Sequence, residues 1–234
     1  MFVRRALALI LAILWLWPGS LYAQSEALKE AYRQGQSLKD AGRYEQAIPH
    51  WRKALELGER EFGPDHATTA TLLNNLAFLY KSQGRYEAAE PLYKRALAID
   101  EKALGPDHPS MATSLNNLAA LYRAQGRYEA AEPLMTRSLA VREKALGPDH
   151  PDVAQSLNNL ALLYVDQGRY EAAEPLLKRA LVVWEKALGP EHPNVATTLE
   201  NYAALLRETE RSAEAERLEA RAESIRAKHA EENP

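Results

Sequence analysis

The sequence contains no cysteine, which excludes disulfide bonds, thiolate metal sites, cysteine nucleophiles and lipid attachment through cysteine. It has only 11 Gly and 13 Pro among 234 residues, too few for a collagen-like or compositionally disordered chain. An excess of positive charge is also absent, because 29 basic residues stand against 32 acidic ones and the formal net charge is -3. This balance gives no electrostatic case for nucleic-acid binding. With 46% hydrophobic residues, the chain is expected to fold into one or two domains.

The amino-terminal segment has the order of charge and apolar residues that is typical of a secretory signal peptide. Arg4 and Arg5 precede an unbroken apolar run over residues 6–17, and Pro18–Ala23 follow it. As a helix, the run would span about 18 Å, well short of the roughly 30 Å of bilayer hydrocarbon. We expect residues 1–23 to be a signal peptide cleaved after Ala23, and the protein to be periplasmic or secreted. The alternatives are an uncleaved segment that tethers the protein to the membrane, and a buried helix.

A repeat of 42 residues organises the chain after this segment. Gly-Arg-Tyr-Glu begins at Gly42, Gly84, Gly126 and Gly168, and one further step reaches Glu210. A period between about 20 and 50 residues is typical of stacked units that bury their apolar faces against one another. The period therefore predicts a repeat fold.

Each period carries the apolar pattern of two helices. The first helix has an apolar stripe at i, i+3, i+4 and i+7, formed in one unit by Leu73, Leu76, Ala77 and Tyr80. The same residue types recur one and two periods later. A second apolar face runs from Tyr86 to near Leu104. Each period is therefore predicted to be a pair of helices.

Turn residues mark the predicted helix ends. Gly84, Gly126 and Gly168 stand where the first helix must stop, which suits a residue that can adopt positive φ. An acid, a histidine and a proline precede the next first helix at 107–109, 149–151 and 191–193, where the acid and the proline are both favourable. A proline also recurs inside the second helix, where we expect a kink rather than a helix end; these residues are Pro49, Pro91, Pro133 and Pro175.

Together these features resemble the tetratricopeptide repeat in its 42-residue kinesin-light-chain form. The resemblance rests on the Gly-Arg-Tyr-Glu-Ala-Ala-Glu-Pro-Leu turn and helix, on Leu-Asn-Asn-Leu-Ala and on the Gly-Pro-Asp-His-Pro linker. The family's signature positions match Leu160, Ala161, Tyr164, Gly168, Ala173 and Ala180. The resemblance implies an all-α fold over residues 24–234, a right-handed superhelical α-solenoid of five helix pairs, or ten helices. The repeats lie at approximately 25–65, 66–107, 108–149, 150–191 and 192–230.

The fifth unit departs from this pattern at two apolar positions. Glu219 stands where earlier units have Tyr93, Met135 and Leu177, and Glu223 where they have Leu97, Leu139 and Leu181. In the earlier units these positions lie on the face that meets the next repeat, whereas in the fifth unit this face is charged. The last helix is therefore predicted to be a solvated, charged C-terminal cap.

The sequence lacks the usual signatures of catalysis and cofactor binding. It contains no glycine-rich phosphate loop, no Gly-x-Ser-x-Gly elbow and no His-Glu-x-x-His helix. Histidines recur in the linkers, but two helix packings of about 8–10 Å each separate successive linkers, so neighbouring histidines cannot share a metal ion. We interpret them as capping or packing residues. Glu87 and Glu90 recur on an exposed helix, where solvation or ion pairing with Lys94 is a simpler interpretation than paired-acid chemistry. We expect no enzyme, no catalytic residue, no cofactor and no metal.

The polar face of the first helices is the candidate site. In the tetratricopeptide family these helices form the inner wall of a groove that binds extended peptides, and the resemblance implies the same here. An asparagine side chain offers donors and an acceptor, so it can hold a peptide backbone in either direction, at about 0.5–1.5 kcal/mol per bond. The alternative is that the amides bond to neighbouring helices and stiffen the stack. The candidate peptide-binding asparagines are Asn74, Asn75, Asn116, Asn117, Asn158, Asn159 and Asn201.

Basic residues are expected to concentrate in the amino-terminal half of the predicted groove. Lys39, Lys81 and Arg123 occupy equivalent positions, whereas the fourth unit has Val165 followed by Asp166. Lys29 and Arg33 are expected on the same face. A ligand with an acidic stretch or a terminal carboxylate would suit the amino-terminal half of the groove, because Lys and Arg form strong charge-assisted hydrogen bonds to carboxylates. A plain solvated face is the alternative.

These expectations give an exported scaffold that binds a protein or peptide in its concave groove, without catalysis. A non-catalytic accessory or regulatory subunit of an enzyme, or of a cell-envelope export or assembly machine, is the alternative function. No nucleic acid is expected as a partner, and no membrane span after cleavage of the signal.

Overall fold

The computed structural model describes residues 18–232, and this part of the chain is helical throughout, without a strand. Five helical hairpins follow one another, which confirms the all-α, ten-helix repeat fold expected from the sequence. The hairpins are α2 (Pro18–Asp40) with α3 (Tyr44–Phe62), α4 (Ala67–Ser82) with α5 (Tyr86–Leu104), α6 (Pro109–Ala124) with α7 (Tyr128–Leu146), α8 (Pro151–Asp166) with α9 (Tyr170–Leu188), and α10 (Pro193–Glu208) with α11 (Ser212–Glu232).

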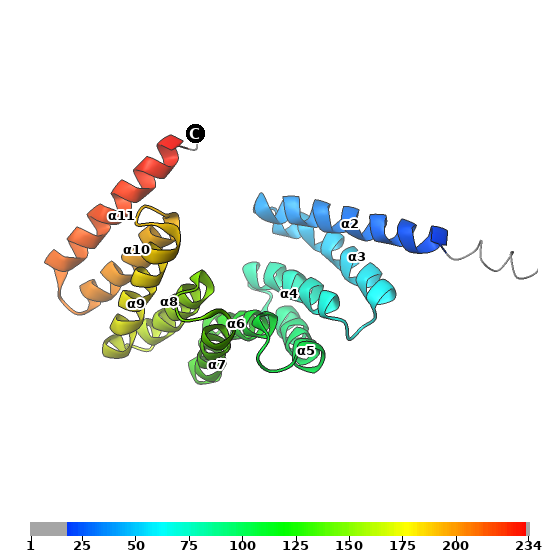
Figure 1. The fold of residues 1–234 in the computed structure, drawn as a ribbon, viewed down its shortest axis with the longest axis horizontal. Helices are drawn as coiled ribbons and strands as arrows, with labels where there is room; N and C mark the ends of the chain where they lie inside the picture. Colours follow the sequence, from blue (N-terminus) through cyan, green and yellow to red (C-terminus); the bar gives the residue numbers. More distant parts are fainter. Residues whose placement is uncertain (1–17, 233–234) are drawn as a thin grey trace, which may run out of the picture. The chain divides into compact units, whose positions relative to one another are not determined.

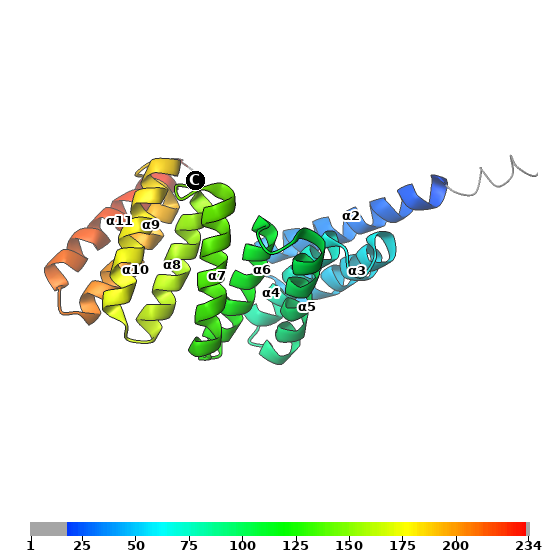
Figure 2. The same ribbon diagram turned by 60° about the horizontal axis from the view of Figure 1, so that its bottom comes forward.

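The chain divides into two compact units, one up to Ala103 and one from Leu104 onward. In the first unit α3 packs against both α2 and α4, and Leu73 of α4 packs with Ala96 and Ile99 of α5. In the second unit each helix from α6 to α11 packs against the next, as Figures 1 and 2 show for the green, yellow and red helices. First helices also touch one another there, α6 with α8 and α8 with α10. Each unit is thus a stack of hairpins.

The predicted glycine turns are confirmed. Gly84 has φ +71° and Gly168 has φ +69°, a left-handed conformation that glycine adopts without steric cost. The turn after α4 closes when the backbone N–H of Arg85 donates to the carbonyl of Tyr80 at 2.9 Å. At the corresponding point after α10 stands Glu210, the only residue other than glycine with positive φ, at +59°, in the described chain. Such turns reverse the chain within a few residues and set each hairpin.

The recurring prolines do not end the second helices. Pro49 lies inside α3, and Pro91, Pro133 and Pro175 lie at the same place in α5, α7 and α9. Each of these helices runs for 19 residues, so the helix continues past the proline as expected. The lost backbone bond is tolerated near the start of the helix, where its partner carbonyl belongs to the first turn.

Second helices supply one large buried side chain at the same position of successive repeats. Trp51, Tyr93, Met135 and Leu177 are all at most 2% exposed. Burial of a side chain of this size contributes roughly 1.5–3 kcal/mol, so the first four hairpins depend on this position. In the second unit Leu177 packs against Tyr202 and Leu206 of the following first helix.

The last helix buries one face and exposes the other. Ala215, Ala222 and Ile225 of α11 are buried against the preceding helices, whereas Glu223 is exposed. Glu219 is half-buried and forms two bonds with Arg207, at 2.7 and 2.5 Å. The face that would meet a further repeat therefore carries charge, as the sequence predicts.

Only part of the predicted signal peptide lies among the described residues. Residues 1–17 lie outside them, and Pro18–Ala23 form the start of α2. Helix α2 is longer than the other first helices, at 23 residues against 16. No helix in residues 18–232 is both long and apolar enough to cross a membrane.

Candidate functional site

The first helices, which carry the candidate site, are fixed at their start by histidine. His66, His108, His150 and His192 are the N-caps of α4, α6, α8 and α10. In each, Nδ1 accepts a hydrogen bond from the backbone N–H two residues later, at 3.1–3.2 Å. The bond satisfies one of the free N–H groups at the helix start. The capping interpretation is confirmed, and within residues 18–232 no cluster of histidine and acidic residues could hold a metal ion.

In the second unit, asparagines join successive first helices. Asn159 of α8 donates through Nδ2 to Oδ1 of Asn116 of α6 at 2.9 Å. Asn201 of α10 donates in the same way to Asn158 of α8, also at 2.9 Å. Asn158 is only 6% exposed, so its amide is held mainly by protein. These bonds match the stiffening role that the sequence left open. The peptide-binding role of the asparagines stays a prediction.

The amide bridge changes between α2 and α4. By the spacing of the other bridges, Asn75 would meet residue 32, which is Tyr32 rather than asparagine. Instead, Asn75 accepts a bond from Nζ of Lys39 at 3.2 Å and donates to the carbonyl of Thr71 at 3.0 Å. Lys39 thereby links the two helices. Asn74 and Asn117 are half-buried on the same helices as the bridging residues.

Lys39 lies among aromatic rings. Its Nζ is 5.7 Å from the ring centroids of both Trp51 and Phe78. Tyr32 packs edge-on against Trp51 with centroids 4.8 Å apart. Tyr32 and Phe78 remain 41% and 37% exposed, large fractions for aromatic side chains. The ammonium group of Lys39 is attracted by the faces of the Trp51 and Phe78 rings, and it has hydrogen-bond donors beyond the one that bonds to Asn75.

A cavity of about 760 Å³ opens between α2 and α4. Leu28, Tyr32 and Leu72 provide its apolar wall, and Lys29, Arg33 and Asp40 are the charged residues that line it. The volume lies within the range of small ligand sites, roughly 300–1,000 Å³. The sequence did not single out Tyr32. The signal that could have done so is the tyrosine at a position where the next three repeats carry asparagine.

The basic residues of the predicted groove have unlike surroundings. Arg123 forms two hydrogen bonds with Asp166, at 2.5 and 3.2 Å, so its charge is already matched within the second unit. Lys81 is half-buried at the end of α4. Lys29 pairs with Glu26 at 2.8 Å, and Arg33 pairs with Glu30. Of the ten candidate residues, the structure brings together Lys39 with Asn75, Asn116 with Asn159, and Asn158 with Asn201.

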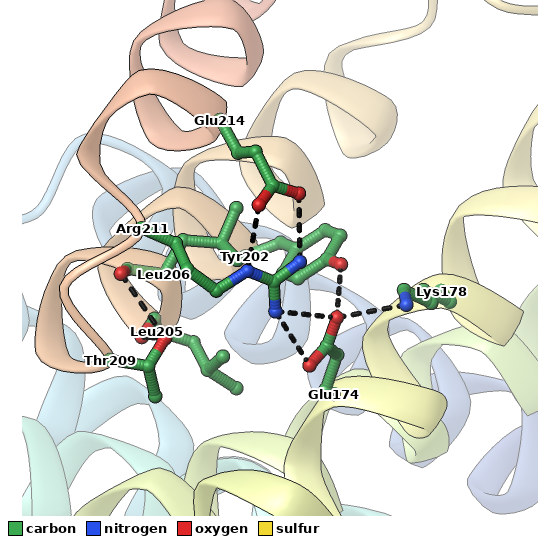
Figure 3. Close-up of polar contacts among 8 residues, drawn as sticks. All are labelled: Glu174, Lys178, Tyr202, Leu205, Leu206, Thr209, Arg211 and Glu214. Atoms are coloured by element: carbon green, nitrogen blue, oxygen red, sulfur yellow. Dashed lines mark hydrogen bonds and ion pairs between the residues drawn. The ribbon is translucent and has the colours of Figure 1, made fainter.

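The glutamates of the second helices belong to packing clusters. Glu90 pairs with Lys94 at 2.7 Å, as the sequence suggested. In a later repeat, Glu174 accepts bonds from Tyr202 and Arg211 at 2.6 and 2.9 Å and pairs with Lys178, as Figure 3 shows. The hydrogen bond from Lys178, together with those from Tyr202 and Arg211, lowers the pKa of Glu174 to about 2. A carboxylate held in this way stabilises the stack and is unsuited to proton transfer near neutral pH.

Comparison with known proteins decides the family. The tetratricopeptide repeat family matches four overlapping stretches, residues 28–102, 68–144, 110–181 and 152–228. The chain belongs to the tetratricopeptide repeat family. A comparison with curated proteins gave no match.

Solved structures of this repeat family have the same fold. Kinesin light chain nearly identical TPR-like repeats from Podosopora anserina share 25% identity, with 86% of this chain and 96% of the other covered and a TM-score of 0.70. BtubC (BKLC) from P. vanneervenii shares 23% identity, with 92% of each chain covered and a TM-score of 0.68. PilF from Pseudomonas aeruginosa shares 22%, with 86% and 78% covered and a TM-score of 0.62. The chain is therefore a repeat protein similar to kinesin-light-chain repeats, and such domains generally bind protein partners.

Proposed function

We propose that this protein is an exported, non-catalytic scaffold that binds an extended segment of a partner protein on the face formed by its first helices. The cavity between α2 and α4 carries the proposal, because it is an open space on that face with apolar and charged residues at its wall. The family supports a protein partner. Basic residues along the first helices favour a segment with acidic side chains or a terminal carboxylate.

Site-specific photo-crosslinking in cells tests which face binds. A photoreactive amino acid replaces Thr71 or Thr113, which are exposed on first helices, or Val182, which is 62% exposed on the second helix α9. The proposal expects a shared crosslinked partner at Thr71 and Thr113 and none at Val182. Crosslinks that form only at Val182 would overturn it. Identification of the partner separates a scaffold from the accessory subunit of an enzyme or envelope machine.

Export is tested on the same cells. N-terminal sequencing of the protein from the periplasmic or secreted fraction should begin at Gln24 if the signal is cleaved as proposed. A membrane-bound protein that keeps residues 1–23 would show that the segment is an anchor. A cytoplasmic protein with the intact segment would refute export.

A further inference from the structure

We propose that the first unit holds a binding site for a carboxylate with a short aliphatic stem, formed by Arg52 of α3, Tyr80 of α4 and Arg85 of the turn before α5. A ligand carboxylate would take the place of a glutamate that later repeats supply from their own second helix. The site is separate from the partner-binding face of the proposed function and does not depend on it.

Glu132 shows what this repeat position holds in the second unit. This residue of α7 accepts a bond from the hydroxyl of Tyr164 at 3.1 Å and another from Arg169 at 2.7 Å. The guanidinium of Arg169 lies over the ring of Tyr164, 4.2 Å from its centroid. The bond from Arg169 lowers the pKa of Glu132, so this arrangement favours a charged carboxylate.

The next repeat adds a cation on the second helix itself. Glu174 accepts a bond from Arg211 at 2.9 Å and pairs with Lys178 at 2.8 Å, as Figure 3 shows. Lys178 lies four residues after Glu174 on α9, the spacing at which helix side chains meet. A tyrosine hydroxyl, an arginine of the following turn and a cation four residues along thus surround the carboxylate.

The first unit has these partners without the acid. The 42-residue repeat places Tyr80 at the position of Tyr164, Arg85 at that of Arg169 and Arg211, and Arg52 at that of Lys178. Where the later repeats have glutamate, this unit has Ile48, which is only 7% exposed and belongs to the core cluster against which Tyr80 packs. An isoleucine side chain has no hydrogen-bond acceptor, so the donors around it are left without a carboxylate.

The tyrosine and the arginine keep their stacked arrangement although the acid is missing. The guanidinium of Arg85 lies 4.5 Å from the ring centroid of Tyr80, and its one hydrogen bond is a long one of 3.5 Å to Gln83. Gln83 in turn donates to Glu45 at 2.6 Å, so this acid bonds to the amide and not to Arg85. Within residues 18–232, neither Arg85 nor Arg52 pairs with a carboxylate, and the Tyr80 hydroxyl has no hydrogen bond. The donors are therefore in place before a ligand binds.

A cavity of about 440 Å³ between α3, α4 and α5 gives the ligand its space. Arg52 and Tyr80 line it, and Leu55, Leu76 and Leu92 provide an apolar wall. The volume is within the range of small ligand sites, roughly 300–1,000 Å³. An aliphatic stem would cover the leucines, which is favourable, while its carboxylate meets the arginines.

Two acids also line this cavity, and both already have partners. Glu59 pairs with Arg95 at 2.5 Å, and Glu56 pairs with Lys53 at 3.2 Å. Their charges are therefore matched by basic residues of α3 and α5. Arg52, the basic residue of the lining, has no such partner among residues 18–232, so the unmatched charge of the lining is positive.

Titration with hexanoate, followed by NMR of the arginine Nε–H groups in the full chain, tests the chemistry. Hexanoate should shift the signals of Arg52 and Arg85 in a saturable way. Hexanamide has the same size without the charge, and it should bind at least about tenfold more weakly. Equal binding of the two compounds, or no saturable shift with hexanoate, would overturn the proposal.

A peptide Ala-Glu-Ala, blocked at both ends, separates two sources of the same chemistry. Its glutamate side chain carries a carboxylate on a short stem, as hexanoate does. Tighter binding of the peptide would identify the side chain of a partner protein as the source, and tighter binding of hexanoate would identify a free aliphatic acid. Either result supports the site.

Ile48→Glu tests the place, because it restores the acid of the later repeats. This variant should abolish the hexanoate shift at Arg52, whereas Val182→Glu, which adds the same charge at an exposed position of α9, should leave it unchanged. Arg85→Gln changes an exposed residue and leaves Ile48 in the core, so it provides a second variant, which should also abolish the shift. Equal effects of the two glutamate variants, or unchanged binding by Arg85→Gln, would overturn the assignment.

A transplant into the second unit tests whether these residues suffice. Glu132→Ile with Thr136→Arg copies the residues of the first unit to a place where Tyr164 and Arg169 are already present. Leucines corresponding to those of the cavity wall are present as well, at Leu139, Leu160 and Leu176. The double variant should bind a second hexanoate, seen as a saturable shift of Arg169 that Thr136→Arg alone lacks. Without a second site, the assignment would be wrong, and the proposed scaffold function would stand unaffected.

Discussion

At Gly35 the absence of a side chain makes room for the indole of Trp51. A Cβ at this position would lie 2.8 Å from both Cδ1 and Nε1 of the indole, closer than side-chain carbons approach other atoms. Later repeats have alanine in place of this glycine on the first helix and a residue smaller than tryptophan on the second helix. Ala161 and Leu177 are one such pair. The sizes of the side chains at these two positions are therefore coupled. The first repeat combines the largest residue on the second helix, Trp51, with glycine on the first helix.

Gly35→Ala should destabilise the protein. Alanine has the higher helix propensity by about 1 kcal/mol, but forcing a methyl group into a filled core costs typically 1–3 kcal/mol. We expect a net loss of about 1 kcal/mol or more in urea unfolding. Trp51→Leu in the same chain should remove the clash, so that Gly35→Ala becomes stabilising in that background. A stabilising effect of Gly35→Ala alone would contradict this account.

The cluster around Glu174 gives a second residue-scale prediction, on pH. Its pKa is about 2 in the folded protein, below the 4.5 of an unperturbed glutamate, because Lys178, Tyr202 and Arg211 bond to the carboxylate. Since the folded pKa is the lower one, the stabilisation is present in full above about pH 4.5 and is lost as the pH falls toward 2. Glu174→Gln should therefore cost on the order of 1 kcal/mol at pH 7, after discounting for solvent screening, and less at pH 3.

Urea unfolding at pH 7 and at pH 3 measures this difference. Glu223→Gln is the control, because Glu223 is exposed on α11 and makes no such cluster. The gap between wild type and Glu174→Gln should narrow at the lower pH, while the control stays within about 0.5 kcal/mol of wild type at both. A gap of constant size would show that shape and packing, rather than charge, make the contribution of Glu174.

At the scale of the helix, the linker histidines act as caps. His150 is the N-cap of α8 and accepts from the N–H of Asp152 at 3.1 Å. His150→Ala should cost about 0.5–2 kcal/mol, because the N–H of Asp152 loses its acceptor. His150→Ser should restore most of the loss, since a serine hydroxyl accepts the same bond. Thermal unfolding of wild type and the two variants measures these losses of stability. Equal losses for alanine and serine would mean that the imidazole acts by packing instead.

The helices and their ends could be predicted from the sequence, whereas the partners of their side chains could not. Apolar spacing around Leu73 and Leu76, and glycines at the turns, follow from local geometry and act within a few residues. The bond between Asn116 and Asn159 joins residues 43 positions apart, so it depends on how the hairpins stack. Glu210 shows another limit, because its positive φ comes from the turn that its neighbours impose.

The surroundings of the candidate basic residues could not be predicted from the sequence. Sequence spacing placed Lys39 and Arg123 at equivalent positions and gave them one role. The structure gives them different neighbours, aromatic rings around Lys39 and the carboxylate of Asp166 beside Arg123. Tyr32, which no motif marks, is one of the residues that line the cavity between α2 and α4. Side chains that differ between repeats thus give the first helices different surroundings, while the shared ones form the repeat fold.

For the molecule as a whole, the charged face of α11 disfavours the stacking of a further hairpin on it. In the preceding repeat, Leu177 is fully buried because Tyr202 and Leu206 of the next first helix cover it. Glu219 occupies the same repeat position in α11 and pairs with Arg207 instead. Charge at this face disfavours burial against a further hairpin, from this chain or from a second copy, because an incompletely paired buried carboxylate is costly.

Replacement of both acids on this face should make the protein self-associate. Glu219→Leu with Glu223→Leu recreates the residues found at 177 and 181, and so presents the apolar surface that a following repeat would cover. Analytical ultracentrifugation over a range of concentrations should show dimers or larger species for the double variant at concentrations where wild type does not change in mass. Glu216→Leu with Arg217→Leu is the matched control, since it adds the same number of leucines to exposed positions of α11 outside these two repeat positions. If both double variants associate equally, general hydrophobicity rather than the end of the repeat stack explains the effect.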